Sequence, residues 1–566
     1  MIQNVVFLLI VTVLVKPLGG YMEKVFSRER TPLDRIFLPI EKLIYRVTGV
    51  DSMREMGFAE YATSFVVFGL AGTLLLYGIL RLQRYLPWFY PAYHTTPLTP
   101  DLSVNVAVSF STTTTWQAYS GETTMAYFSQ MAGLCAQNFL AAAAGLAVGI
   151  AFIRGMARQM TDTLGNFWVD LTRALLWILL PAALVGAMLL IWQGTPMNFH
   201  PYAVASTIEG GKQVIPQGPV GALEIIKNVG TNGGGFFNAN GAHPYENPTP
   251  LTNFLELLAI VLLPAGLTNT FGRMVGQPRQ GWMLYWVMVV LFCAGLFFVQ
   301  HYEQRGNLLL RAESHNHIAR DGGNMEGKEV RFGIGGSALA ATVTSNTATG
   351  SANSADDSYT SLGGMILLLN LLIGELIFGG LGTGIYSIVM AAAIAVFLAG
   401  LMVGRTPQYL GKKIGPPENK MILLYALAAP VFILPLTAIA LSTYAGRAGL
   451  TVNQGAHGLT AILFNFASCF ANNGQAFASL NGNTPFYNIT TLIAMLAGRF
   501  ALAIPALALA GLFARQKSTP ESSGTVPTDS ISFGVLLMAC IVILAALSYL
   551  PALALGPLLE RLTLGT

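Results

Sequence analysis

Charged residues are scarce in this chain. They make up 10% of its 566 residues, whereas a soluble domain usually carries about 25%. Hydrophobic residues make up 53%, and the net charge of +4 is small for the length. The low charged fraction and the high hydrophobic fraction exclude an ordinary soluble protein and indicate a polytopic membrane protein. The small net charge argues against a nucleic-acid-binding surface.

Sequence motifs for a disulfide framework, a resident metal or a nucleotide site are also missing. The four cysteines are widely spaced and form no CxxC pair, so we interpret them as small buried apolar residues. His315 and His317 form an isolated HxH in a hydrophilic stretch, which is more typical of polar surface than of a metal site. The chain has no GxxxxGKS/T motif, so we expect neither an ATP site nor an organic cofactor.

Hydrophobic stretches long enough to cross a bilayer, about 20 residues each, are abundant. They lie at 2–20, 62–83, 127–153, 170–192, 251–272, 281–300, 363–404, 421–442, 488–514 and 530–553. The seventh stretch greatly exceeds this length and contains a glycine-rich interruption at 379–384, so we expect it to break there. The first has neither a basic leader nor a cleavage pattern, and we expect it to remain as a first span.

Lysine and arginine are distributed unevenly among the connections between these stretches. Eight of them lie within residues 16–54, and every second later connection is basic as well, at 154–158, 273–279, 405–413 and 515–517. Basic connections tend to stay in the cytoplasm. The pattern therefore predicts an N-terminus on the outer side of the membrane.

Four of the outer connections share one design, in which a short apolar run is followed by a cluster of small polar residues and a polar return. The clusters lie at 112–117, 231–233, 348–351 and 472–474. An irregular return from a half-crossing helix is tolerated in a membrane only where it lines a wet cavity within the protein. Two of these regions also repeat in register, with Asn232 opposite Asn473 and Asn240 opposite Asn481, as duplicated transporter units do.

These patterns predict an all-α polytopic membrane protein with about ten spans. We expect four units of span, re-entrant helix and span (M1-P-M2) around a pseudo-fourfold axis, with extra transmembrane helices at the N- and C-terminal ends. The predicted divisions are an N-terminal span and cytoplasmic loop at 1–61, pore repeats at 62–160, 161–275, 276–415 (with a broken second helix) and 416–516, and a linker with the C-terminal span at 517–566.

The run 228–237, with Thr231, Asn232 and three consecutive glycines, indicates what the four units converge on. Glycine adopts backbone angles closed to other residues and leaves little side-chain bulk, so main-chain carbonyls there are able to turn toward a common axis. A ring of carbonyls that replaces the hydration shell of an ion is the chemistry of a cation filter. The partly negative C-terminal ends of four half-helices would favour a cation further.

Further stretches carry a family resemblance. They are 116–122 (WQAYSGE), 230–237, 246–249 (ENPT), 374–375, 404–413 and 498–500. Together with the four clusters they resemble, over essentially the whole chain, the potassium-transporting A subunits of Kdp-type pumps, members of the superfamily of K+ transporters that includes Trk and Ktr. The resemblance implies a K+-binding, channel-like subunit in a bacterial inner membrane that takes K+ from the periplasm and does not itself hydrolyse ATP.

The resemblance also implies partners and a filter. ATP would be used by a P-type ATPase subunit (KdpB), which receives K+ through a lateral tunnel, and KdpC and KdpF would be small membrane subunits. The implied filter residues, acting through backbone carbonyls, are Thr113, Thr114 and Thr115, then Thr231, Asn232 and Gly233, then Ala348, Thr349 and Gly350, then Asn472, Asn473 and Gly474. Gln117 matches a family position beside the filter. The all-Thr first segment and Thr349 depart from related sequences, and we expect them to tune affinity without changing the ion.

Two ionisable residues, Glu375 and Arg499, lie within predicted spans. Charges at that depth are costly and often functional, but a structural role and a role in gating or tunnel lining fit the sequence equally well. The resemblance implies that the glycine break, with Gly380 and Gly382, is a gating loop below the filter. A packing kink is the alternative.

Arg405, Lys412 and Lys413 follow the broken span on its cytoplasmic side. They suffice as topology determinants. As an alternative, they contact the ATPase partner or anionic headgroups of the membrane lipids.

Three functions compete on the sequence alone. The first is the K+-translocating subunit of an ATP-driven pump. The second is a self-sufficient K+ channel or symporter similar to Trk and Ktr. The third, a membrane-embedded enzyme or a carrier of organic solutes, would need clustered carboxylates or histidines within spans, where only Glu375 and Arg499 stand out.

Overall fold

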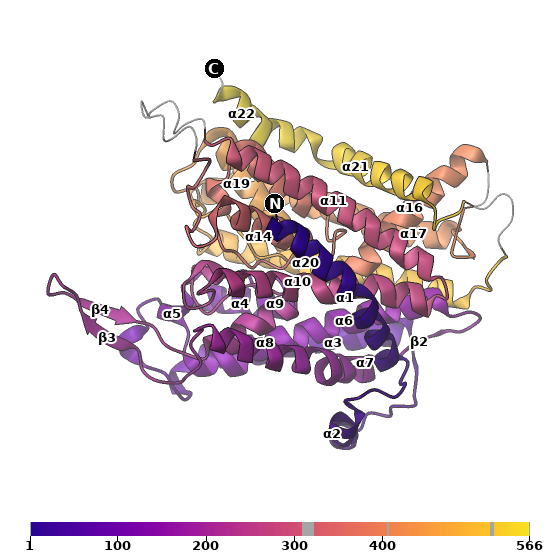
Figure 1. Cartoon of the computed structure of the whole chain (residues 1–566), viewed down its shortest axis with the longest axis horizontal. Coiled ribbons are helices and arrows are strands. Elements are labelled where there is room, and N and C mark those ends of the chain that lie inside the picture. The colour runs from indigo at the N-terminus through magenta and orange to yellow at the C-terminus, as the bar shows by residue number, and fades with distance from the viewer. Residues whose placement is uncertain (1, 308–321, 405–406, 521–525, 565–566) are drawn as a thin grey trace.

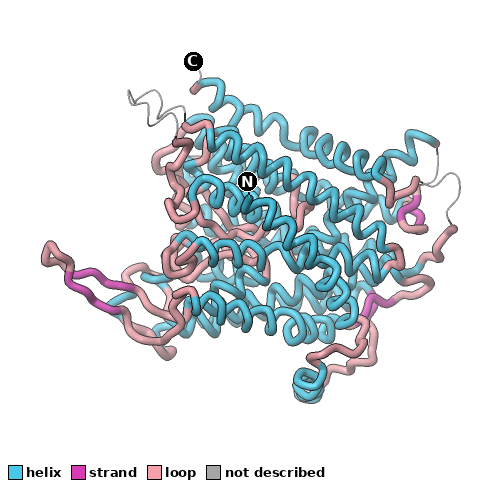
Figure 2. The backbone as a smooth tube through the Cα atoms, in the orientation of Figure 1, coloured by secondary structure: helices cyan, strands magenta, loops and turns pink. Residues whose placement is uncertain are grey.

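The computed structural model describes residues 2–307, 322–404, 407–520 and 526–564, so His315, His317 and Arg405 lie outside the described residues. Within these ranges the chain forms a bundle of roughly parallel and antiparallel helices (Figures 1 and 2), ten of which are long and apolar enough to cross a membrane. The ten crossings are α1 (Ile2–Phe26), α3 (Phe58–Leu82), α6 (Ala136–Ala157), α7 with α8 (Phe167–Arg173, Leu180–Trp192), α10 (Pro250–Met274), α11 (Pro278–Gln304), α16 (Thr383–Val403), α17 (Pro416–Ser442), α20 (Pro485–Arg515) and α21 with α22 (Ile531–Leu553, Leu559–Thr563).

The predicted break in the seventh span is confirmed. A short helix, α15 (Ser361–Leu372), enters the bundle and is followed by an irregular loop at 373–382 before α16 begins. Gly374 and Gly382 have φ angles of +80° and +97° in this loop, which only glycine adopts without strain. The chain therefore continues as two helices joined by a non-helical loop within the bundle.

Four short helices precede the four predicted clusters. They are α4 (Pro100–Ser111), α9 (Val220–Val229), α14 (Gly333–Thr347) and α19 (Gly455–Phe470). Each lies in sequence between two spans, so the predicted arrangement of four pore repeats with additional first and last spans is confirmed. The exact divisions between repeats stay predictions.

Three helices of these repeats begin at a Thr-Pro pair. Thr99, Thr249 and Thr484 are the N-caps of α4, α10 and α20, and each side-chain hydroxyl accepts a backbone N–H of the first turn. Proline follows at the first helical position, where its missing N–H costs nothing and its fixed φ suits the helix. The local sequence thus fixes where these helices start relative to the clusters.

The second helices of the repeats, α6, α10, α16 and α20, form the interior of the bundle. They contact one another, and most residues of α6, α10 and α16 are buried, whereas fewer than a third of the residues of α1, α3 and α17 are buried. Additional helices cover this interior from outside: α1 packs along α10, and α21 packs on α11 and α16. The four clusters therefore lie largely buried within the bundle.

Strands are short and lie at the ends of the bundle. Among the described residues they form three antiparallel pairs, β1 (Met56–Gly57) with β2 (Thr163–Gly165), β3 (Ala203–Ser206) with β4 (Lys212–Ile215), and β5 (Gln408–Tyr409) with β6 (Lys412–Lys413). The β3–β4 hairpin projects from one end of the bundle (Figure 2). A helix that was not predicted, α2 (Asp34–Thr48), lies at the flank of the other end and is seen nearly end-on in Figure 1.

Candidate functional site

Each predicted filter segment is anchored by the same hydrogen bond. We name residues 113–115, 231–233, 348–350 and 472–474 segments 1 to 4. The central residue of each segment donates its backbone N–H to the carbonyl five residues earlier, at the end of the preceding half-helix. These bonds are Thr114 to Ser109 (3.0 Å), Asn232 to Lys227 (2.8 Å), Thr349 to Thr344 (3.2 Å) and Asn473 to Ser468 (2.9 Å). The pseudo-fourfold relationship therefore extends to individual backbone atoms.

The four segments share the same sequence of left- and right-handed backbone conformations. The first and third residues of each segment have positive φ angles, and the central residue does not. The angles are 64° and 49° in segment 1, 52° and 78° in segment 2, 51° and 75° in segment 3, and 54° and 90° in segment 4. Alternation between left- and right-handed conformations turns successive carbonyls to one side. Five of the eight positions are not glycine, where this conformation costs roughly 1–2 kcal/mol, so the surrounding protein must impose it.

The segments also touch in a closed order. A Cβ added to the third residue of one segment would collide with the central carbonyl of the next. The distances are 1.8 Å from Gly233 to Thr349, 1.8 Å from Gly350 to Asn473, and 2.1 Å from Gly474 to Thr114. In segment 1 this third residue is Thr115, whose Oγ1 donates to the carbonyl of Asn232 at 2.5 Å. Each central carbonyl thus contacts the third residue of the preceding segment, and the four contacts close a ring that runs 1, 2, 3, 4 and back to 1.

A wide polar cavity opens on one side of this ring. It has a volume of about 520 Å³ and is lined by parts of segments 1, 3 and 4 and by the polar returns that follow all four segments. Gln117 lies at the wall of this cavity and contacts the return that follows segment 2, because Nε2 donates to the carbonyl of Gly235 at 3.0 Å and Oε1 accepts the N–H of the same residue at 2.8 Å. Gln117 therefore lies beside the ring of segments 1 to 4.

A much smaller cavity of about 10 Å³ lies on the other side of the ring. It is lined by the first residue of every segment, which brings all four together, and by Glu375, Gly380, Leu381, Thr383 and Arg499. Arg499 donates to Thr113 Oγ1 at 3.1 Å and to the carbonyl of Ala141 at 2.8 Å. A cavity of this size holds at most about one water-sized particle, so the ring is nearly closed below.

The loop between α15 and α16 forms the floor of this small cavity. Its Leu381 N–H donates to Thr231 Oγ1 of segment 2 at 2.7 Å. A Cβ on Gly382 would lie 2.0 Å from the carbonyl of Gly145 in α6, and Glu375 accepts the N–H of Gly380 at 2.8 Å. The loop is therefore tied to the filter segment above it and packed directly against α6.

A third cavity, which is mainly apolar, lies on the far side of that loop. It has a volume of about 230 Å³ between α15, α16, α17 and α21. Glu375 lines this cavity as well as the small one below the ring. It is the carboxylate that borders both spaces.

Buried charges behind segment 2 were missed in the sequence. Lys227 and Glu224 of α9 are both fully buried and form an ion pair of 2.9 Å. The ammonium of Lys227 also donates to Oδ1 of Asn240 at 2.5 Å, and Nδ2 of Asn240 donates to the carbonyl of Gly350 in segment 3 at 3.0 Å. The sequence did contain a signal for this ion pair, because a lysine that follows a glutamate by three residues lies next to it on a helix.

The alternative role of Lys412 as a contact of the ATPase partner does not fit its place in the structure. Its side chain is 1% exposed, and its ammonium donates to the carbonyls of Arg158, Phe513 and Gln516 at 2.5, 2.9 and 3.2 Å. The lysine satisfies carbonyls at the ends of α6 and α20, so it is unavailable to a partner. Lys413 beside it is exposed.

Ten spans, four half-helices and a ring of apposed carbonyls define a four-repeat pore-loop transport protein. The chain belongs to the Potassium-transporting ATPase A subunit family, which matches residues 5–562. A protein named potassium-transporting ATPase potassium-binding subunit from Methylobacterium nodulans is 50% identical over 553 residues, covering 98% of this chain and 95% of its own. One of the same name from Koribacter versatilis is 49% identical over 578 residues, covering 99% and 98%.

The fold is also similar to that of a transporter of known structure. The crystal structure of the potassium transporter TrkH from Vibrio parahaemolyticus aligns with a TM-score of 0.50 and 15% sequence identity, covering 88% of this chain and 96% of that chain. At this identity the likeness concerns the fold alone.

Proposed function

We propose that this chain is the K+-binding and K+-translocating subunit of an ATP-driven potassium uptake pump, with segments 1 to 4 as its selectivity filter. The ring carries the proposal, because four central carbonyls face neighbouring segments at the ends of four half-helices. Carbonyls arranged in this way replace the hydration shell of K+, and the negative ends of the half-helices favour a cation. The names of the relatives support potassium as the ion.

In this proposal the filter opens to the periplasm through the wide polar cavity, and the N-terminus lies on the same side. The basic connections of the sequence support this orientation. The membrane is a bacterial inner membrane. ATP is hydrolysed on a P-type ATPase partner (KdpB), with KdpC and KdpF as small partners, since this chain has no nucleotide motif of its own and its relatives are named subunits of an ATPase.

We infer that K+ leaves the filter sideways. The cavity below the ring and the apolar cavity between α15, α16, α17 and α21 share Glu375, so a cation that passes the loop at 373–382 enters the apolar cavity next to this carboxylate. Arg499 lies on the filter side of the same point. In this reading Glu375, Gly380, Gly382 and Arg499 form the gate, and Lys413 is the exposed contact residue for the ATPase partner.

The decisive experiment compares K+ stimulation of ATP hydrolysis by the purified complex with that of a Gly233→Asp variant. Because a side chain at Gly233 meets the carbonyl of Thr349, we expect the variant to lose K+ affinity and selectivity. Unchanged K+ dependence would refute the filter assignment. Reconstitution of the chain alone tests the second candidate, a self-sufficient K+ channel or symporter, whose fold this chain shares: autonomous K+ flux would replace the pump proposal.

A further inference from the structure

The helix α2 exposes a continuous apolar stripe. Ile36, Ile40, Leu43 and Val47 follow one another at helical spacing and are 59%, 40%, 58% and 77% exposed. An adjacent face is fixed to the protein. Glu41 forms an ion pair of 2.8 Å with Arg173, and Phe37 packs edge-on against Trp177 with ring centroids 5.5 Å apart. The stripe is therefore held outward by a rigid attachment.

The position of α2 matches a bilayer surface. In Figure 1 the helix is seen nearly end-on beside the bundle, whereas the spanning helices run across the picture, so its axis lies across theirs. It is in the first predicted cytoplasmic connection, and Arg35, Lys42 and Arg46 are exposed on it. An amphipathic helix with basic flanks that lies in the membrane plane buries its apolar face at the boundary between headgroups and acyl chains.

The two chain segments that flank α2 line a cavity of about 400 Å³ at this end of the bundle. Its basic lining residues are Arg28, Arg154, Arg158 and Arg173. Three of them have carboxylate partners: Arg154 pairs with Asp170, Arg158 with Glu55, and Arg173 with Glu41. The hydrogen bond from Arg158 holds the pKa of Glu55 at about 2, against the effect of burial, so this carboxylate stays charged.

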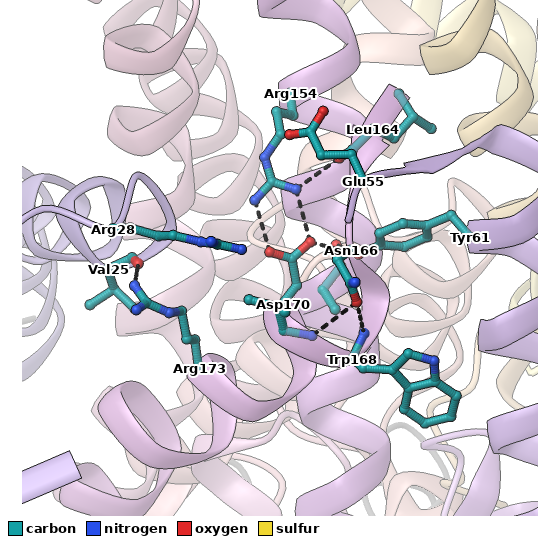
Figure 3. Close-up of polar contacts among 12 residues, drawn as sticks. Val25, Arg28, Glu55, Tyr61, Arg154, Leu164, Asn166, Trp168, Asp170 and Arg173 are labelled. Carbon is teal, nitrogen blue, oxygen red and sulfur yellow. Dashed lines mark hydrogen bonds and ion pairs between the residues drawn. The ribbon is translucent and has the colours of Figure 1, made fainter. Parts of the chain in front are cut away.

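Arg28 differs from the other three. Within the described part of the chain it forms no ion pair, and it donates to the carbonyl of Ser52 at 2.6 Å and to the sulfur of Met53 at 3.8 Å. Its φ angle is 58°, a conformation that costs a non-glycine residue roughly 1–2 kcal/mol. Figure 3 shows its guanidinium extended toward the Arg154–Asp170 pair. One uncompensated positive charge therefore faces the cavity.

We propose that α2 and the arginine cavity together bind an anionic phospholipid of the cytoplasmic leaflet. The headgroup phosphate accepts hydrogen bonds from Arg28 in the cavity, and the acyl chains lie along the stripe of Ile36, Ile40, Leu43 and Val47. A guanidinium matches phosphate geometry, and the apolar stripe selects a lipid over free phosphate. The site is independent of the filter, because it lies at the opposite end of the spans.

The test measures lipid binding to the full complex in nanodiscs. We expect phosphatidylglycerol to be bound in preference to phosphatidylcholine, as measured by lipids retained in native mass spectrometry. An Arg28→Met variant should lose about fivefold of this preference, the effect of one basic residue at an anionic surface. A Leu43→Glu variant, which alters an exposed side chain and leaves the attachment of α2 intact, should lose a similar share. Lys517→Met removes an exposed cytoplasmic charge elsewhere and should change nothing.

Three results would overturn the proposal. They are equal binding of the two lipids, equal effects of Arg28→Met and Lys517→Met, and displacement of phosphatidylglycerol by inorganic phosphate. The last would assign the cavity to a free anion. K+ binding by the same variants should stay at the level of the unaltered protein, which separates this site from the filter.

Discussion

The side-chain amide of Asn240 donates a hydrogen bond of 3.0 Å to the carbonyl of Gly350, which joins the return of segment 2 to segment 3. The ammonium of Lys227 donates a hydrogen bond of 2.5 Å to Oδ1 of the same side chain. The positions equivalent to Lys227 in half-helices 1, 3 and 4 are Ser109, Thr344 and Ser468. A charged brace therefore supports the ring on one side only.

We expect Asn240→Ala to weaken K+ binding about two- to tenfold, the range of one net hydrogen bond. The reason is that the Gly350 carbonyl loses the donor that fixes its direction. Lys227→Met combined with Glu224→Gln, which removes both partners of this ion pair, should have a similar effect. Adding Asn240→Ala to that pair should cause little further loss, because Lys227 acts through Asn240. Calorimetric titration of the complex with K+ and Rb+ measures all of these.

The pseudo-symmetric residue Asn481 provides the control for the brace. It lies opposite Asn240 in the internal repeat but is exposed. Asn481→Ala should leave affinity and the K+/Rb+ ratio unchanged. If it matched Asn240→Ala, or if the effects of the Lys227 and Asn240 changes added fully, the brace would have no specific role.

Close packing of the ring predicts that Gly350→Ala abolishes K+ binding. An added Cβ would lie 1.8 Å from the carbonyl of Asn473. Gly276→Ala is a matched control, because Gly276 has a similar φ of +74° but nothing within 4 Å of an added Cβ. Both variants carry the same backbone strain, so only Gly350→Ala should lose K+-dependent thermal stabilisation. Retained stabilisation in that variant would mean that the ring does not hold the ion.

Because Glu375 lies between two cavities, we expect its substitution to change the rate of K+ transport. Glu375→Gln should lower the maximal rate of K+ transport about tenfold, equivalent to ~1.4 kcal/mol of barrier, while the apparent KM for external K+ stays the same. The reason is that the carboxylate stabilises the cation after it has left the ring. Flux assays of the reconstituted complex measure both quantities. A rise in KM with an unchanged maximal rate would instead assign Glu375 to ion binding.

The buried, uncharged ring of His243 leads us to expect that the protein loses folding stability in mild acid. Its ring stacks on Phe237 with centroids 3.8 Å apart, and Nδ1 accepts the N–H of Tyr245 at 3.1 Å. Burial, assisted by the positive charge of Arg331, lowers the pKa of His243 to about 4. The unfolded chain, with a pKa of about 6.5, therefore takes up the proton first. Stability should fall as the pH drops below about 6.5 and level off below about 4.

Thermal melting at several pH values between 7.5 and 5 checks this expectation. A His243→Gln variant, which cannot titrate, should lose less stability on acidification than the unaltered protein. His200→Gln, at an exposed position, serves as the control and should behave like the unaltered protein. Identical acid sensitivity in the His243→Gln variant would show that another group is responsible.

Most of the fold was predictable because the length of each hydrophobic stretch and the turn residues between stretches are local features of the sequence. All ten spans, the break before Thr383 and the four half-helices follow from them. The amphipathic helix α2 was missed although the spacing of Ile36, Ile40, Leu43 and Val47 is helical, since the basic residues around it were interpreted only as topology determinants. The period alone was enough to find it.

Contacts between distant segments were not predictable from local patterns. Asn240 and Gly350 are 110 residues apart, and no periodicity relates them. The burial of Lys412 depends likewise on carbonyls of two other helices. The four clusters were found from their shared sequence design, and their filter residues were implied by the family resemblance. Their closed order came only from the packing of each third residue against the next carbonyl.

The most direct test is to locate the transported ion in the structure of the complex. Crystals or cryo-EM samples prepared with Tl+ or Rb+ in place of K+ would show its position, by anomalous scattering or by density that changes with the ion. Our account predicts an ion on the axis between the carbonyl oxygens of Thr114, Asn232, Thr349 and Asn473. An ion bound elsewhere, with this ring empty under conditions that support transport, would contradict it.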